Sequence, residues 1–201
     1  MPSLTPTVIV MVKEPRPGRV KTRLGRDIGM VPAAWWFRHQ TRFLIRRLRD
    51  PRWQLVLAVS PDREGMLSRV WPADLPRWPQ GSGDLGARMG RMMRRAPGPV
   101  CVIGGDIPGI TPAHIPHAFG LLGSHKAVFG PAPDGGYWLV GLRHARPFPV
   151  GFLEDVRWST EHALADSARS LRYGSIAYAD TLADVDTAAD LAMTRAGARA
   201  S

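Results

Sequence analysis

Short runs of apolar residues recur along the chain, and each predicts a buried strand. Thr7–Val12, Gln54–Val59 and Pro99–Ile103 carry almost no polar residue, as is typical of a parallel sheet that is covered on both faces. Shorter runs of the same kind predict further strands at Lys126–Phe129, Tyr137–Leu142 and Ser175–Tyr178.

Between these runs, apolar residues recur at the spacing of a helix with one buried face. In Asp84–Ala96 we expect Leu85, Met89, Met92 and Met93 to point inward. Further helices are expected over Pro32–Arg49, over Asp62–Val70 with Asp62 as cap, from Thr111-Pro112, from Ser159 or Thr160 to Leu171, and over Thr187–Thr194.

The alternation of strands and helices predicts an α/β fold, Rossmann-like, with three α/β/α layers and a mostly parallel (mixed) sheet. We expect residues 1–201 to form one domain in which 195–201 is a frayed tail. Residues 71–79, rich in Pro and Trp, are expected to be irregular. Their tryptophans fit either a homodimer patch or a packed loop.

Composition adds little to this picture except through its cations. Apolar residues make up 44% and charged residues 22%, as in ordinary globular proteins. No apolar run approaches the roughly 20 residues of a membrane span, and Thr7–Val12 is too short for a signal-peptide core. The single Cys101 excludes an internal disulfide. We therefore expect a cytoplasmic protein without a membrane partner.

The net charge of +10 favours anionic partners, although 24 of the 27 basic residues are Arg, which fits a general bias toward Arg at the surface. Lysine supplies a compact point charge that the Arg fork does not copy, and two of the three lysines, Lys13 and Lys21, lie close together. A non-catalytic nucleic-acid binder is the remote alternative; it predicts steeply salt-dependent binding. Acidic residues at the strand ends would repel nucleic acid, so no such partner is expected.

The segment after the first strand, Lys13–Leu24, contains five cations and one anion. Ligands of open α/β sheets bind beyond the carboxyl ends of the strands, so backbone amides and cations here could hold a di- or triphosphate. The spacing of a P-loop is absent, and a solvated basic turn is the alternative. Candidate phosphate-binding residues are Lys13, Gly18, Lys21 and Arg23.

Four carboxylates follow strands or open a helix. Asp106, after a buried strand, is well placed to hold Mg²⁺, which takes one or two protein carboxylates beside phosphate and water. Asp184 and Asp186 alternate in an extended segment and could face one site, one capping the helix and the other binding metal. Asp134, before Gly135 and Gly136, fits a hairpin turn equally well.

Two further segments could line the ligand site. Glycines in Gln80–Gly86 would let the backbone approach a nucleoside. The alternative for Asp84 is that it serves just as the N-cap of the next helix. Trp158–Thr160 could line an acceptor pocket or supply a helix cap and a core Trp. The candidates are Gly83, Asp84 and Gly86 for the nucleotide, and Gly135, Gly136, Tyr137, Trp158, Ser159 and Thr160 for the acceptor.

Together these motifs resemble a bacterial family of largely uncharacterised proteins with the glycosyltransferase-A-like (GT-A) fold of nucleotide-diphospho-sugar transferases. Some members are named arsenosugar-biosynthesis glycosyltransferases. The resemblance runs from Val8 to about Met193. The motifs that carry it, in order, are Lys13–Leu24, Gln80–Met89, Gly104–Pro108, Gly130–Tyr137 and Trp158–Thr160.

More distantly, the chain is similar to the 2-phospholactate and molybdenum-cofactor guanylyltransferases. In the former, Asp-x-Pro and Asp-Val-Asp-Thr motifs supply the metal-binding aspartates, which implies Asp106 and Asp186 here. The Gly-rich triphosphate loop of such enzymes is replaced here by Pro-x-Pro-Gly. The Gly-Asp-Leu-Gly segment stands where those relatives have Gly-Leu-Asn, so no base preference is implied.

The function that we expect is a nucleotidyltransferase dependent on Mg²⁺ (or Mn²⁺), which transfers a nucleotidyl group from an NTP to a small phosphorylated or hydroxyl acceptor. Lys21 and Arg23 would offset charge on the leaving pyrophosphate, and Asp134 would face the acceptor. The alternative is a glycosyltransferase that uses an NDP-sugar, because the same metal and cations serve a departing NDP.

Overall fold

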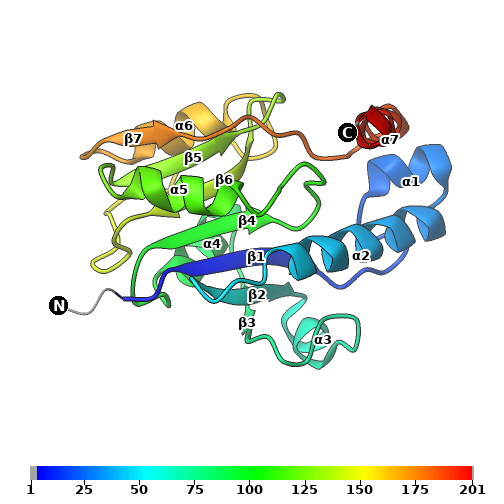
Figure 1. Cartoon of the computed structure of the whole chain (residues 1–201), viewed down its shortest axis with the longest axis horizontal. Coiled ribbons are helices and arrows are strands. Elements are labelled where there is room, and N and C mark those ends of the chain that lie inside the picture. The colour runs from blue at the N-terminus through cyan, green and yellow to red at the C-terminus, as the bar shows by residue number, and fades with distance from the viewer. Residues whose placement is uncertain (1–3, 201) are drawn as a thin grey trace.

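The computed structural model describes residues 4–200, and the side chains of 4–194. One sheet lies at its centre, with strands in the order β3-β2-β1-β4-β6-β5-β7 (Figure 1). The strands are β1 Thr7–Lys13, β2 Gln54–Ser60, β3 Arg77–Pro79, β4 Val100–Gly104, β5 Ala127–Pro131, β6 Tyr137–Leu142 and β7 Ile176–Tyr178. Only β6 runs antiparallel to its neighbours in this described sheet, which confirms the expected mostly parallel, mixed α/β fold.

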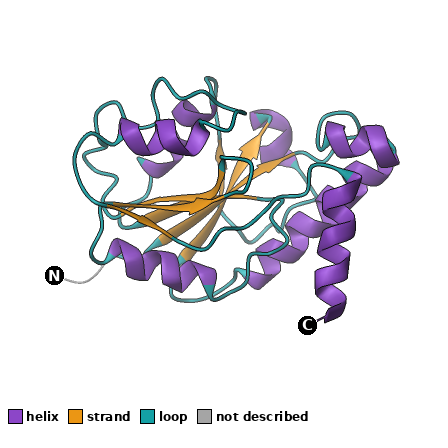
Figure 2. Ribbon diagram, turned by 90° about the horizontal axis from the view of Figure 1, so that it is seen from above, coloured by secondary structure: helices purple, strands orange, loops and turns teal. Residues whose placement is uncertain are grey.

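Helices cover both faces of the sheet (Figure 2). They are α1 Thr22–Ile28, α2 Met30–Arg47, α3 Asp62–Leu67, α4 Leu85–Met93, α5 His114–Leu122, α6 Ala163–Ser170 and α7 Ala188–Ala200. None of the helices among the described residues is long and apolar enough to cross a membrane.

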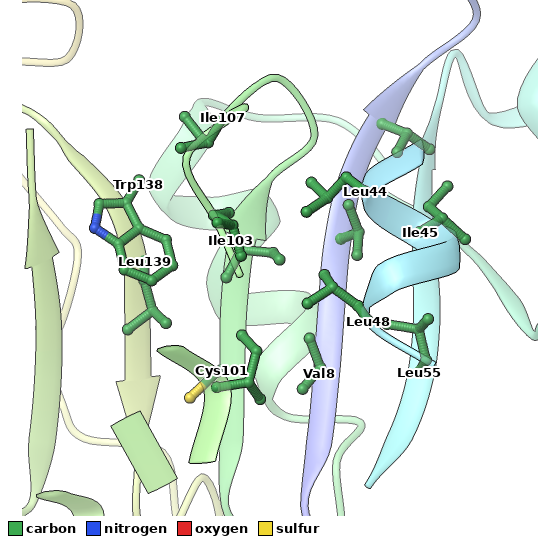
Figure 3. Packing of buried hydrophobic residues seen from close by; sticks show 14 of the residues in the cluster. Val8, Leu44, Ile45, Leu48, Leu55, Cys101, Ile103, Ile107, Trp138 and Leu139 are labelled. Atoms are coloured by element: carbon green, nitrogen blue, oxygen red, sulfur yellow. The ribbon is translucent and has the colours of Figure 1, made fainter. Parts of the chain in front are cut away.

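The side chains of β1 alternate between the two faces, as its unbroken apolar run requires. Val8 and Val10 belong to the core under α2 and α5, whereas Ile9 belongs to the core under α4. In Figure 3, Leu44 of α2 and Leu48, which directly follows α2, pack toward the strands of the first core. Each such fully buried side chain contributes about 1.5–3 kcal/mol.

The chain leaves β1 and β4 toward opposite halves of the sheet. After β1 it passes through α1 and α2 to β2, and after the neighbouring β4 it passes through α5 to β5 on the other side. Such a divergence leaves a crevice outside the carboxyl ends of the two strands. Lys13 and Gly104 end these strands, so the segments that follow them meet at this crevice.

A helix that we did not expect, α1, begins inside the segment assigned to a loop. Thr22–Ile28 has no side-chain cap and no acidic residue in its first turn. Short helices are held mainly by packing, and here Leu24 is buried against Ala33 of α2 and Leu191 of α7. Figure 1 shows α7 beside α1, where the Ala188 N–H donates to Asp27.

Several expected helix boundaries were wrong. Asp62 lies inside α3, after Pro61, and its carboxylate accepts from the Gly81 N–H instead of capping the helix. The helix expected from Thr111 starts at His114, whose ring bonds the Thr111 N–H. Asp84 does cap α4, but Leu85 is 44% exposed although we expected it inside.

The carboxyl-terminal part differs in similar ways. Neither Ser159 nor Thr160 caps α6, which begins at Ala163; the Thr160 hydroxyl donates to the Arg157 carbonyl. Helix α7 continues to Ala200, and Ser201, the end of the expected frayed tail, lies outside the described residues. Residues 71–79 include strand β3, and Trp71 is buried, so it belongs to a packed loop.

Candidate active site

A lysine surrounded by three aspartates occupies the crevice between β1 and β4. The Lys21 Nζ lies 2.7 Å from Asp106 Oδ2, 3.0 Å from Asp184 Oδ2 and 2.6 Å from Asp186 Oδ1. The lysine side chain is 6% exposed, against 26–39% for the carboxylates. Four residues from three segments far apart in sequence thus form one charged cluster, the Lys21 cluster.

Backbone geometry aims the Lys21 side chain at this cluster. Lys21 has φ 46° and ψ 49°, a left-handed conformation that is unfavourable for a residue with a side chain. Such strain persists where surrounding contacts compensate for it, and it gathers at functional sites. Here three ion pairs compensate.

Burial and charge act against each other on the ionisation of the cluster. Burial lowers the pKa of Lys21, but Asp106 and Asp184 outweigh this effect, and the net pKa is raised above its usual 10.5. Burial raises the pKa of Asp184. For Asp186, burial acts in the same direction, but hydrogen bonding to Lys21 prevails and the pKa is lowered. Lys21 therefore stays charged at neutral pH.

A cavity of 790 Å³, here called the basic cavity, opens beside the cluster. Its lining includes Asp84, Asp106, Asp186 and the glycine Gly83, and it meets the end of β1. Its five cations come from the end of β1, from the segment after it, from α1 and from α4: Lys13, Arg19, Lys21, Arg23 and Arg88. A cavity with this charge can hold an anion with several negative charges.

Two candidate nucleotide residues lie away from the lining of this cavity. Gly18, at φ +74°, forms a turn with open space around it. Gly86 is buried, and a Cβ there would overlap the Leu153 carbonyl oxygen and lie 2.8 Å from the Trp158 indole. The glycine is therefore required for packing α4 against residues 153–158, and not for a close approach to a nucleoside.

This packing makes a prediction. Gly86→Ala should lower the free energy of unfolding by about 2–3 kcal/mol, because the overlap forces the backbone of α4 and the 153–158 segment apart. Urea unfolding measures the change. Gly120→Ala is the matched control, since a Cβ at this helical glycine meets nothing within 4 Å, and it should be neutral or slightly stabilising. Equal effects of the two substitutions would contradict this role of Gly86.

A second cavity of 270 Å³, here called the apolar cavity, lies between β4, β6 and the 158–160 segment. It shares Asp106, Trp158 and Ser159 with the basic cavity. The other expected acceptor residues that line it are Gly136, Tyr137 and Thr160, together with Asp134. The structure thus brings most of the expected acceptor residues together beside the Lys21 cluster.

Not every residue of this set faces the apolar cavity with a free polar group. Gly135 does not line it; a Cβ there would overlap the Glu161 carbonyl oxygen. The Tyr137 hydroxyl bonds Ser167 Oγ at 3.1 Å, and burial raises its pKa. Asp134 Oδ1 accepts from the Gly136 N–H at 2.9 Å, so this carboxylate does shape the turn.

The donor atoms of the Lys21 cluster suit a hard divalent cation in part. Asp106 and Asp186 direct carboxylate oxygens to one point, which the Lys21 ammonium occupies in this structure, so a metal ion would replace the ammonium there. Among the described residues, however, no three His, Cys, Asp or Glu side chains form a ready-made metal cage. The pair therefore fits a cation that takes its remaining ligands from water and phosphate.

The expected capping role of the last two aspartates is wrong. Both Asp184 and Asp186 reach Lys21, and the start of α7 is satisfied otherwise. The Asp190 carboxylate accepts from the backbone N–H groups of Asp186 and Thr187.

A profile for a family of uncharacterized proteins conserved in bacteria, DUF2064, matches residues 44–160, more than half of the chain. The chain belongs to the DUF2064 family. This membership confirms the resemblance to a bacterial family inferred from the motifs. No curated protein sequence matches the chain.

Solved structures with the same fold include nucleotide and sugar-nucleotide transferases. A candidate nucleotide-diphospho-sugar transferase from Desulfovibrio desulfuricans G20 is 28% identical, with TM-score 0.81 over 94% of this chain and 85% of that chain. A nucleotidyl transferase from Methanothermobacter thermautotrophicus is 13% identical, with TM-score 0.62 over 98% and 99%. Rv0371c of Mycobacterium tuberculosis H37Rv, in complex with manganese, is 17% identical, with TM-score 0.53 over 94% and 97%. The expected fold and the general class of transferase are thereby confirmed.

Three residues that line the two cavities were missing from the predicted sets of ligand-binding residues. Asp184 was noticed beside Asp186 but was not included in the metal set. Arg19 and Arg88 line the basic cavity, but the abundance of arginine, with 24 in the chain, gave neither of them a distinctive signal. The helical spacing of Arg88 from Asp84, one turn along α4, was the signal that could have found it.

Proposed function

We propose that the protein is a nucleotidyltransferase dependent on a divalent metal, with the NTP in the basic cavity and the acceptor in the apolar cavity. The observation that carries the proposal is the Lys21 cluster, which lies where the two cavities meet. The five cations around the basic cavity outnumber its three aspartates, so the positive excess, together with a divalent cation, matches a triphosphate better than a singly charged ligand.

In the proposed reaction, an acceptor oxygen attacks the α-phosphorus, and the bond from that phosphorus to the β-phosphate oxygen breaks. Pyrophosphate leaves with the electron pair of the broken bond, and the proton of an acceptor hydroxyl passes to Asp134. Lys21, Lys13 and Arg23 offset the charge that grows on the pyrophosphate. Trp158 and Ser159 stand between the two cavities and hold the acceptor in line.

Asp106 and Asp186 would hold the metal ion, which supplies charge neutralisation at the phosphates. Magnesium is the proposed ion, and the manganese complex of the structural neighbour Rv0371c supports a divalent cation of this kind. A glycosyltransferase that uses an NDP-sugar is the second candidate. This second candidate is favoured by the 28% identity to the Desulfovibrio desulfuricans structure, which is described as a candidate nucleotide-diphospho-sugar transferase.

A thermal-shift panel tests the proposal. Each NTP and the UDP-, GDP- and dTDP-sugars are added with and without Mg²⁺. We expect one NTP to stabilise the protein only with Mg²⁺, by about 2.7 kcal/mol when its concentration is 100-fold above Kd. Release of pyrophosphate, not NDP, then identifies the reaction. Stabilisation by an NDP-sugar alone would favour the second candidate, and no stabilisation by any nucleotide would reject both.

A further inference from the structure

The two cavities differ sharply in charge. The basic cavity is lined by five cations, which outnumber its three aspartates, whereas none of the described residues that line the apolar cavity is Lys, Arg or His. Three aspartates line the apolar cavity instead: Asp106, Asp134 and Asp184. A phosphate group placed here would face like charge without a cation of its own.

Lys21, which contacts two of these aspartates, does not compensate for the negative charge of the apolar cavity. Lys21 Nζ contacts Asp106 and Asp184, but it is also shared with Asp186. Asp186 has a second partner in Arg23 at 3.4 Å, so Asp106 and Asp184 share the charge of Lys21 with a third carboxylate, and Asp134 adds a further negative charge. Taking an anionic group out of water without a partner is strongly unfavourable.

The residues that line the apolar cavity indicate which kind of ligand the cavity can bind. Met89, Ile103, Ile107 and Val140 line it. The Trp158 Nε1–H is shielded from solvent and has no hydrogen-bond partner among the described residues. An apolar wall with a few polar groups is typical of small-molecule sites, and 270 Å³ is near the lower end of their size range of about 300–1,000 Å³.

The segment that carries Trp158 is set in a costly backbone conformation. Leu153, Asp155 and Ser159 have φ of 66°, 54° and 60°, which residues with side chains rarely adopt. Such strain is retained where a site must be shaped in advance of its ligand.

We propose that the acceptor is a small hydroxyl compound with an apolar body, uncharged or cationic, and not a phosphate ester. This inference rests on the proposed function, because it treats the apolar cavity as the acceptor site. The hydroxyl is the nucleophile, and Asp134 is the carboxylate that excludes an anionic acceptor.

Three probes with one shared body test the inference: 4-methylbenzyl alcohol, 4-(aminomethyl)benzyl alcohol and 4-(hydroxymethyl)benzyl phosphate. Their dissociation constants are measured by ligand-observed NMR at low ionic strength, for the wild type and for three variants. We expect the neutral and cationic probes to bind at least about tenfold more tightly than the phosphate. Asp134→Lys should reverse this order.

Glu161→Lys is the matched control, because it makes the same change of charge at a side chain that is 80% exposed and outside the cavity lining. It should leave the order of the probes unchanged. Asp134→Asn, which keeps an acceptor for the Gly136 N–H, should weaken the discrimination without reversing it.

Preference of the wild type for the phosphate probe, or an order unaffected by Asp134→Lys, would overturn the inference. So would the absence of binding by all three probes in protein that a nucleotide still stabilises. If the charge order holds but no nucleotide stabilises the protein, the apolar cavity keeps its assigned selectivity and the transferase function fails. The two failures are therefore distinguishable.

Discussion

Lys21→Met should lower the free energy of unfolding by about 2–3 kcal/mol. The substitution keeps an unbranched apolar side chain but leaves Asp106, Asp184 and Asp186 facing one another without their shared cation. Removing one partner of a buried ion pair costs about 3–5 kcal/mol. We expect a smaller value because these carboxylates are 26–39% exposed and solvent screens their repulsion.

The same variant should bind a divalent cation more tightly than the wild type, since the ammonium no longer competes for the carboxylates. Urea unfolding with and without Mn²⁺ measures both effects, and Mn²⁺ should restore part of the lost stability. Lys13→Met is the matched control, because Lys13 lines the same cavity but is exposed. Wild-type stability of Lys21→Met, or no greater rescue by Mn²⁺ than in the control, would contradict this account of the cluster.

The stability difference between the wild type and Lys21→Met should depend on pH in a defined way. The folded-state pKa of Lys21 is raised, so its contribution is complete below the unfolded value of 10.5 and is lost as the pH rises further. The folded-state pKa of Asp186 is lowered, so the contribution of its pairing is present above 3.8 and is lost as the pH falls further. From neutral pH up to 10.5 the difference should stay nearly constant. As the pH falls below neutral, the difference should begin to decrease already above 3.8, because the pKa of Asp184 is raised.

Asp106→Asn should reduce the release of pyrophosphate from the donor selected by the thermal-shift panel by about 10²–10³-fold. The amide has the shape of the carboxylate but lacks its charge, so it binds a metal weakly, and metal ions supply several kcal/mol to such reactions. The protein should stay folded because Asp184 and Asp186 still pair with Lys21. Release rates are measured at saturating nucleotide over a range of Mg²⁺ concentrations.

Asp74→Asn serves as the control, because Asp74 pairs with Arg49 far from the Lys21 cluster. It should leave the rate and its dependence on Mg²⁺ unchanged. A rate for Asp106→Asn close to that of the control would remove Asp106 from the proposed metal site.

Much of the fold could be predicted because its signals are local. The run Thr7–Val12 forms β1 since an unbroken apolar stretch has to be covered on both faces. Asp84 caps α4 because its side chain bonds the Ala87 N–H three residues away. Helix α1 escaped notice because Leu24 is buried by residues of α2 and α7, which lie far along the chain.

Most residues of the candidate site were predicted from the sequence, but the structure gives some of them other contacts than those expected. Lys21 was expected on a phosphate, and the structure places its ammonium among three carboxylates. Asp184 lies 163 residues from Lys21, so no local pattern could show that they meet. Gly86 looked like a ligand-binding glycine, but its neighbours Leu153 and Trp158 come from a distant segment.

The buried strands, the α/β class and the residues available for chemistry after β1 and β4 could all be predicted from the order of the amino acids. These features follow from side-chain periodicity and from the rule that ligands bind at the carboxyl ends of parallel strands. Tertiary structure alone decided which charges pair and which cavity carries them. Coulomb interactions depend on distance in space, so the difference in charge between the basic cavity and the apolar cavity exists only once the sheet brings the segments together.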